Sequence, residues 1–178
     1  MKTFKLALIF LLISSLGFAQ KSPKKEAIGT IGDVNISISY SAPSVKGRTI
    51  WGKLVPYGKV WRAGANENTT ITFDKDVIIN GMELAAGKYG CFIIPIEEGD
   101  WTIIFNKKNN AWGAKSYNQE EDVLRINSTP DFASVAQELL FFSIGENTIK
   151  FAWEKIRMEL FVLNKEPSQK AGIEFIKN

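Results

Sequence analysis

Apolar and polar residues alternate along much of this chain, and this is the feature that most constrains its fold. In residues 34–40 every second residue is apolar or aromatic, and the residues between them are Asn or Ser. Successive side chains of an extended strand point to opposite faces, so this spacing predicts a strand with one buried face. Residues 70–73 repeat the pattern.

Further strands are predicted from apolar runs bounded by turn residues. Asn80 and Gly81 form the dipeptide favoured in two-residue hairpins, because both central positions of such a turn take positive φ. Residues 86–87, 97–100 and 145–147 mark three more turns. The strands predicted around these turns are 77–79, 88–96, 101–105, 123–127, 136–144, 148–153 and 155–163.

Short strands with turns between them favour an all-β fold, and we expect an antiparallel β-sandwich, jelly-roll-like or related. Beyond the N-terminal 19 residues, only 169–177 is compatible with a short helix. The chain has no internal repeat and no low-complexity linker. We therefore expect one domain over residues 27–163, preceded by a polar tether at 20–26 and followed by a polar tail at 164–178.

Residues 1–19 have the three parts of a signal peptide. Lys2 and Lys5 precede an apolar run at 6–13, and Gly17 and Ala19 are the small residues that a signal peptidase reads. The apolar run is shorter than the roughly 20 residues that span a bilayer as a helix. The pattern predicts a protein without a transmembrane anchor, exported to the periplasm or the extracellular space and soluble after cleavage.

The net charge of the mature chain argues against two classes of partner. Cleavage after Ala19 removes Lys2 and Lys5, which leaves 20 basic and 19 acidic residues. A net charge of about +1 gives little attraction to nucleic acid or to an anionic membrane. Neither is expected as a partner.

The sequence contains no histidine, which excludes Ser-His-Asp and Cys-His catalysis and the usual catalytic zinc sites. No Gly-rich phosphate loop or dinucleotide motif is present either. The acidic turn at 97–100 is interpreted as a solvated hairpin and not as a calcium site. We expect no cofactor and no metal.

The single cysteine, Cys91, cannot form an internal disulfide and lies in the apolar run 89–94. A nucleophilic thiol normally needs a nearby base or positive field. Cys91 is therefore predicted to be a core residue, and so are Trp101 and Trp153, which fall within predicted strands.

One long segment does not follow the strand-and-turn pattern. Residues 41–67, here called the long loop, are dense in Gly, Pro, Trp, Lys and Arg. Long irregular connections in compact domains are often functional, arginine binds carboxylates, and aromatic faces pack on sugar or acyl groups. The candidate ligand-binding residues are Lys46, Arg48, Trp51, Tyr57, Trp61, Arg62, Asn66 and Glu67, joined by Trp112 from a later loop.

The same residues have a structural interpretation. A long loop has many backbone amides and carbonyls to satisfy, and Arg, Asn and Glu side chains often bond them. The sequence leaves both interpretations open.

Several motifs of the chain resemble an uncharacterised bacterial family, domain-of-unknown-function family 2911. In the long loop they are YSAPSVKGR (40–48), IWG (50–52), LVPYG (54–58) and WRAGANE (61–67). The resemblance continues through AGKY (86–89), IP (94–95), WTIIFN (101–106) and WG (112–113), and covers roughly residues 22–160. Such proteins are mostly exported and have no assigned reaction, so the resemblance implies export and no particular activity. The family motifs match at Lys46, Arg48, Arg62, Asn66 and Glu67.

Three functions are compatible with the sequence. The leading hypothesis is a non-enzymatic periplasmic or envelope binding module for a small polar ligand or glycan. The second is a histidine-free hydrolase or lyase, in which Glu67 is the acid or base and Arg48 or Arg62 stabilises negative charge in the transition state. The third is a structural component of an envelope assembly, in contact with another envelope protein.

Overall fold

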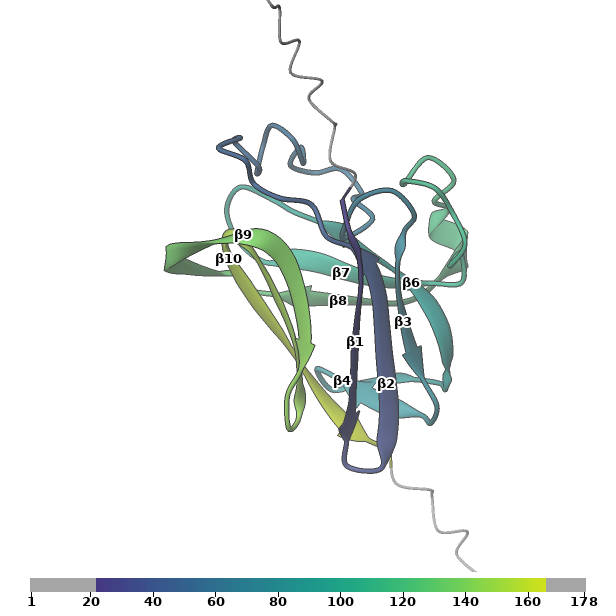
Figure 1. Cartoon of the computed structure of the whole chain (residues 1–178). Helices are drawn as coiled ribbons and strands as arrows, with labels where there is room; N and C mark the ends of the chain where they lie inside the picture. Colours follow the sequence, from purple (N-terminus) through teal and green to yellow (C-terminus); the bar gives the residue numbers. More distant parts are fainter. Residues whose placement is uncertain (1–21, 166–178) are drawn as a thin grey trace, which may run out of the picture.

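The computed structural model describes residues 22–165, which form two antiparallel β-sheets (Figure 1). A 3-10 turn, η1 (Gln119–Glu121), precedes the eighth strand. The strands are β1 (Lys24–Ile31), β2 (Val34–Ser41), β3 (Thr69–Phe73), β4 (Val77–Ile79), β5 (Met82–Leu84), β6 (Gly87–Ile94), β7 (Trp101–Asn106), β8 (Asp122–Ser128), β9 (Asp131–Ile144) and β10 (Thr148–Asn164).

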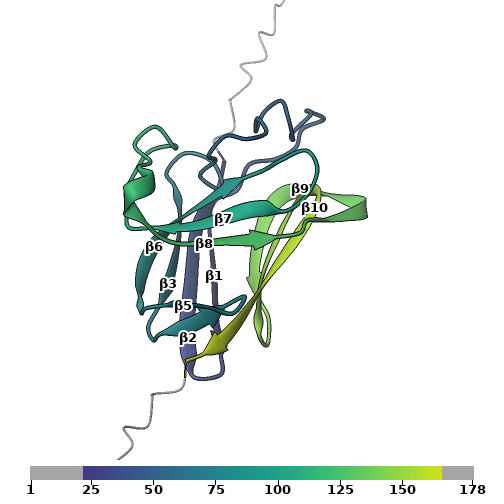
Figure 2. The ribbon, with the colours of Figure 1, turned by 180° about the vertical axis from the view of Figure 1, so that it is seen from behind.

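The first sheet has six strands in the order β1-β2-β3-β6-β7-β8, and the second has four in the order β5-β4-β10-β9. β9 and β10 are the longest strands and pair as one hairpin that runs diagonally beside the first sheet (Figures 1 and 2). The predicted all-β class and antiparallel sandwich are confirmed.

The core lies between the sheets and follows the alternation seen in the sequence. In β2, Val34, Ile36, Ile38 and Tyr40 are buried, whereas Asn35 and Ser39 are exposed. β10 contributes the buried set Phe151, Trp153, Ile156, Met158, Leu160 and Val162 from the second sheet. Burial of these apolar faces is the main stabilising contribution to the fold.

The predicted hairpin at Asn80 and Gly81 is confirmed, since both residues have positive φ (47° and 83°) and join β4 to β5. Two strand boundaries differ from prediction. The strands expected at 148–153 and 155–163 form one strand, β10, because a bulge at Glu154 (φ 51°) shifts the register without ending the pairing. β9 begins at Asp131 and not at 136. The sequence did not predict this start, because the first six residues of the strand are largely exposed and do not alternate between apolar and polar.

The predicted tether at 20–26 is wrong for its last three residues. β1 begins at Lys24 and pairs with β2 along its whole length, from Lys24 opposite Ser41 to Ile31 opposite Val34. β1 is an edge strand with mostly exposed side chains, and lysine is common on such edges. The same lysines concealed the strand in the sequence. The predicted signal peptide (1–19) and tail helix (169–177) lie outside the described residues.

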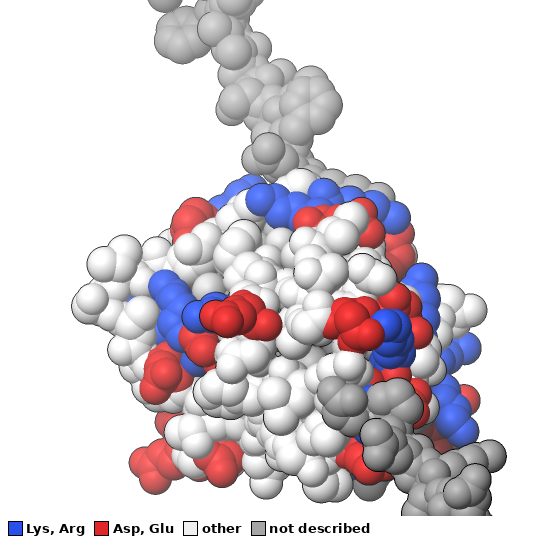
Figure 3. Space-filling model, turned by 90° about the horizontal axis from the view of Figure 1, so that it is seen from below, with Lys and Arg blue, Asp and Glu red and all other residues white. Residues whose placement is uncertain are grey.

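Charged side chains of both signs lie close together on the surface, as the face seen from below shows (Figure 3). Several form exposed ion pairs, among them Lys165 with Glu83 (2.6 Å) and Lys150 with Glu159 (2.9 Å). Such pairs add little stability, but they leave no large field of one sign on this face. Within residues 22–165, no helix has the length and apolarity needed to cross a membrane.

Gly90 in β6 is the point where the loop after β7 crosses the first sheet. A Cβ atom at this position would overlap the backbone oxygen of Lys108 and lie 2.6 Å from the side-chain nitrogen of Asn68. Asn68 also donates to the Lys108 oxygen (3.1 Å) and accepts from the Ala111 amide (2.8 Å). This close crossing holds the loop that carries Trp112 beside the end of the long loop.

We therefore expect Gly90→Ala to lower the free energy of unfolding by about 1–3 kcal/mol or more, because a backbone atom must move to admit the methyl group. Chemical denaturation measures the change. Lys88→Ala is the matched control, since Lys88 is exposed on the same strand. Equal stability of the two variants would contradict the close approach of the Lys108 backbone to Gly90.

Candidate functional site

The long loop lies across one end of the two sheets, at the top of Figure 1. Backbone bonds attach it to both. Trp61 and Ile93 exchange two hydrogen bonds of 2.8 Å, which ties the loop to β6 in the first sheet. Val45 donates to the Glu138 oxygen (2.8 Å), and Leu140 donates to the Pro43 oxygen (3.0 Å), which tie it to β9 in the second. The loop therefore bridges the sheets.

Four of the five tryptophans pack together beneath this loop. Trp51 contacts Trp101, Trp153 and Trp61 at ring-centroid distances of 4.6, 5.6 and 5.7 Å, and Trp61 stacks on Trp153 at 5.5 Å. Trp101 and Trp153 are core residues, as predicted, and Trp61 is buried with them. Trp51 and Trp61, predicted as ligand-binding walls, chiefly anchor the loop. We call this group the tryptophan cluster.

A pocket of about 220 Å³ lies against the tryptophan cluster, and we call it the loop pocket. Three of the predicted site residues line it together: Arg48, Trp61 and Arg62. Its other lining residues were not predicted, because they are small, apolar or distant in sequence: Ser22, Pro43, Leu54, Val55, Gly64, Ala65 and Trp153. The lining contains two arginines and no acidic residue.

Arg62 is the most unusual group of this pocket. It is half-buried, its Nε is fully buried without a hydrogen-bond partner, and no side-chain hydrogen bond or ion pair joins Arg62 to any other described residue. Burial lowers the pKa of Arg62 from its usual value, although a guanidinium remains charged at any ordinary pH. A partly desolvated cation without a counter-charge is unfavourable, so an anion in the pocket would stabilise it.

Arg48 combines the two interpretations made from the sequence. Its Nε donates to the Val45 oxygen (3.0 Å) and its Nη2 donates to the Ser44 oxygen, so the side chain caps two loop carbonyls. The residue is nevertheless exposed and lines the loop pocket. Arg48 thus holds the turn in place and adds positive charge to the pocket.

Glu67 lies against a different hollow. Its Oε1 is 3.2 Å from the Nζ of Lys24 in β1, and it lines a hollow of about 40 Å³ with Lys24, Ser39, Tyr40, Ser41 and Asn68. Asn66 takes positive φ (58°), and its side-chain nitrogen donates to the Ser22 oxygen (3.4 Å). The structure therefore does not bring Glu67 and the two arginines together in one pocket.

The remaining predicted residues lie outside the loop pocket. Lys46 is exposed in a left-handed turn (φ 49°), and its backbone amide donates to the Glu138 carboxylate (2.9 Å). The Tyr57 ring lies so close to Gly52 that a Cβ atom on Gly52 would collide with it. The pKa of Tyr57 is raised, mainly by burial and to a lesser extent by the negative charges of Glu97 and Glu154. Trp112 is 62% exposed, and its backbone bridges to Glu67.

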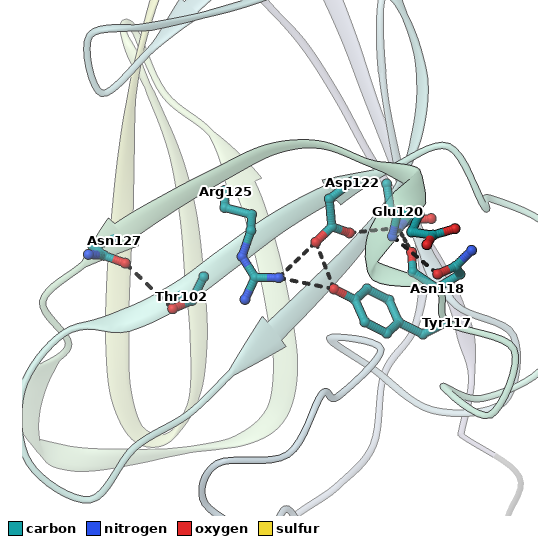
Figure 4. A network of polar contacts seen from close by, with 8 residues as sticks. Thr102, Tyr117, Asn118, Glu120, Asp122, Arg125 and Asn127 are labelled. Carbon is teal, nitrogen blue, oxygen red and sulfur yellow. Dashed lines mark hydrogen bonds and ion pairs between the residues drawn. The ribbon is translucent and has the colours of Figure 1, made fainter.

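A second polar network contains a buried carboxylate whose hydrogen-bonding capacity is met by neighbouring side chains (Figure 4). The buried Asp122 side chain accepts from the Tyr117 hydroxyl (2.7 Å), Arg125 Nη1 (2.8 Å) and Asn106 Nδ2 (2.7 Å). Burial and the bond to Asp122 raise the pKa of Tyr117 to about 12. This network secures the loop before β8, and its charged groups Asp122 and Arg125 are paired with each other, in contrast to Arg62.

Two further features of residues 22–165 bear on the sequence predictions, namely the grouping of metal-ligating side chains and the burial of the single thiol. Over residues 22–165, no three His, Cys, Asp or Glu side chains are grouped so that they could hold a metal ion. Cys91 is 2% exposed among apolar side chains of both sheets, and burial raises the pKa of its thiol to about 12. Its predicted place in the core is confirmed.

Cys91 should therefore be unreactive in the native protein. At about pH 8, where an exposed cysteine is substantially ionised, we expect no reaction with an aromatic disulfide reagent until denaturant is added. Absorbance of the released thiolate measures both states, and the denatured sample is the control. Rapid reaction of the folded protein would contradict the burial.

We expect Arg62→Met to leave the melting temperature unchanged or to raise it, because the substitution keeps an apolar stem and removes an unpaired, partly buried charge. Arg125→Met is the matched control. It should lower stability by about 1–3 kcal/mol, since it takes a charged donor from the buried Asp122 carboxylate. A drop in Arg62→Met as large as that in Arg125→Met would identify Arg62 as a member of a structural network.

Comparisons with known proteins identify a family without assigning an activity. A search of curated proteins and a search of solved structures each found no match. A family model described as "Protein of unknown function (DUF2911)" matches residues 22–162, which contain both sheets almost completely and all of the long loop. The chain belongs to the DUF2911 family of proteins of unknown function.

Proposed function

We propose that this protein is an exported, non-enzymatic binding module and that its loop pocket holds a small polar ligand through an anionic group. The observation that carries the proposal is the half-buried Arg62, which lines the pocket and has no partner for its guanidinium within residues 22–165. A bound anion would supply the missing counter-charge.

A carboxylate fits this pocket best. Guanidinium presents parallel N–H donors that match the two oxygens of a carboxylate, and such pairs are among the stronger hydrogen bonds in proteins. Arg48 adds a second positive charge, and the absence of Asp and Glu from the lining removes any competing internal partner. A neutral ligand would leave the Arg62 charge uncompensated.

The other walls suggest what the rest of the ligand is like. Pro43, Val55 and Leu54, which is 45% exposed, give the pocket an apolar side. A volume of about 220 Å³ is small for a ligand pocket. A compact organic acid with an apolar body is therefore a better match than a long polymer.

Binding is favoured over catalysis because the pocket lacks an acid or base. Its lining has no carboxylate, lysine, cysteine or histidine, and Glu67, the candidate acid or base, lines another hollow in an ion pair with Lys24. Arginine is a poor proton-transfer group, because its pKa lies far above neutrality. The export part of the proposal rests on the signal-like sequence at 1–19.

We expect the protein to bind at least one member of a panel of small acids, such as benzoate, succinate and glucuronate, and not the matching neutral amides. Fluorescence titration is a suitable readout, since Trp61 and Trp153 line the pocket. Arg62→Gln should weaken binding about tenfold to a hundredfold, the value of a lost charged hydrogen-bond pair.

Lys53→Gln is the matched control, because it removes one positive charge from an exposed position of the same loop without altering the pocket lining. Its affinity should equal that of the wild-type protein. Equal affinity of Arg62→Gln would place the acid elsewhere, and failure of every acid in the panel would contradict the proposal. Turnover of an ester or glycoside that Glu67→Gln abolishes would favour the hydrolase instead.

A further inference from the structure

A larger hollow lies away from the long loop, where the two sheets come to an edge. Its volume is about 610 Å³, and we call it the edge groove. It is lined by the end of β8, the last strand of the first sheet, with the turn that follows it, and by the β4–β5 turn, the start of β9 and part of β10 in the second sheet. Its lining residues are Asn80, Asn127, Ser128, Thr129, Asp131, Glu159 and Phe161.

Phe161 gives the edge groove an exposed aromatic face. It is 58% exposed on β10, whose neighbours Leu160 and Val162 are buried. The backbone N–H of Phe161 donates to the side-chain oxygen of Asn80 (2.8 Å), and the backbone N–H of Asn80 donates to the backbone oxygen of Phe161 (2.9 Å). These two bonds hold the Asn80 side chain against the Phe161 backbone, so the two residues lie side by side in the wall of the groove.

The polar groups around the ring offer both donors and acceptors. The side-chain oxygens of Asn80 and Asn127 already accept hydrogen bonds, from the Phe161 amide and from Thr102 (3.5 Å, Figure 4). The side-chain Nδ2 atoms of both asparagines make no hydrogen bond to any residue within 22–165. Glu159 pairs with Lys150 at 2.9 Å, whereas the carboxylate of Asp131 has no hydrogen bond or ion pair with the described part of the chain.

We propose that the edge groove is a second binding site, which takes a neutral, hydroxyl-rich ligand of the glycan class. A sugar hydroxyl both donates and accepts, so it can bond to a carboxylate oxygen and to an amide N–H side by side. The C–H face of a sugar ring can pack on the exposed phenyl ring of Phe161. Two carboxylates with one lysine nearby disfavour an acidic glycan.

The two hollows thus differ in chemistry. The loop pocket offers two guanidinium groups and no carboxylate, and the edge groove offers two carboxylates and no arginine. An acidic ligand suits the first and a neutral polyol the second. The inference about the edge groove therefore does not rest on the function proposed for the loop pocket.

The test is a titration of the protein with neutral trisaccharides, namely cellotriose, maltotriose, xylotriose and N,N′,N″-triacetylchitotriose. Saturation-transfer NMR detects weak binding, and calorimetry gives the affinity. We expect at least one of them to bind with a Kd on the order of 1 mM. Phe161→Ala should weaken that binding about tenfold, because the stacking surface is lost.

Two variants on the same elements make the result specific. Leu163→Ala is the matched control, since Leu163 is 56% exposed on the same face of β10 but does not line the groove. It should bind like the wild-type protein. Asp131→Asn should weaken binding, because it replaces a charged acceptor by a neutral amide.

Absence of binding to all four trisaccharides overturns the proposal, and so does equal affinity in Phe161→Ala and wild type. An extended peptide that binds along the free edge of β8, with no trisaccharide bound, also overturns it. Arg62→Gln should bind the trisaccharide normally, so a failure here leaves the loop-pocket proposal untouched, and the reverse also holds.

Discussion

The packing of Trp51 and Trp61 against Trp101 and Trp153 is the interaction on which the long-loop end of this protein depends. Trp101 comes from β7 and Trp153 from β10, so the cluster joins both sheets to the long loop. The side-chain nitrogens of Trp51 and Trp153 are buried without partners, at a cost of about 1–3 kcal/mol each. Burying an indole of about 150–250 Å² contributes roughly 4–6 kcal/mol, so the packing outweighs the unpaired N–H groups.

Arg62 differs from those indoles, because packing does not explain it. A half-buried guanidinium gains little from apolar contact and loses hydration, and the fully paired Asp122 network shows that this fold can satisfy a buried charge where structure alone requires it. The backbone around Arg62 is tightly specified: a Cβ on Gly64 would lie 2.9 Å from the Thr69 hydroxyl and 3.0 Å from the Ser41 oxygen. The loop thus holds in a fixed position a charge that no residue within 22–165 compensates, which is typical of a binding site.

The sequence predicted the fold wherever one face of a strand is buried, as in β2, and at the Asn80–Gly81 turn, where local chemistry determines the conformation. It failed where exposure removes the pattern, at β1 and at the start of β9. For the candidate site, residue type placed Arg48 and Arg62 among the candidates, and both line the loop pocket, but it did not predict that Glu67 lines a different hollow. That partition depends on the pairing of Lys24 with Glu67 and on Trp153, 91 positions after Arg62, and no local spacing encodes either contact.

The strand β10 links the two proposed sites and also keeps them apart. Its inward residue Trp153 forms part of the loop pocket, and its outward residue Phe161 lies eight positions further, in the edge groove. At about 3.3 Å per residue this separation is on the order of 26 Å along the strand, more than a Debye length at physiological salt. The charge of a ligand in one site would therefore be screened from the other.

A shift in the register of β10 is the most direct structural route between the two sites, and the bulge at Glu154 lies between Trp153 and Phe161. β10 is paired with β4 on one side and with β9 on the other. A shift of β10 along these two strands would therefore break many backbone hydrogen bonds. The fold therefore favours two sites that act independently.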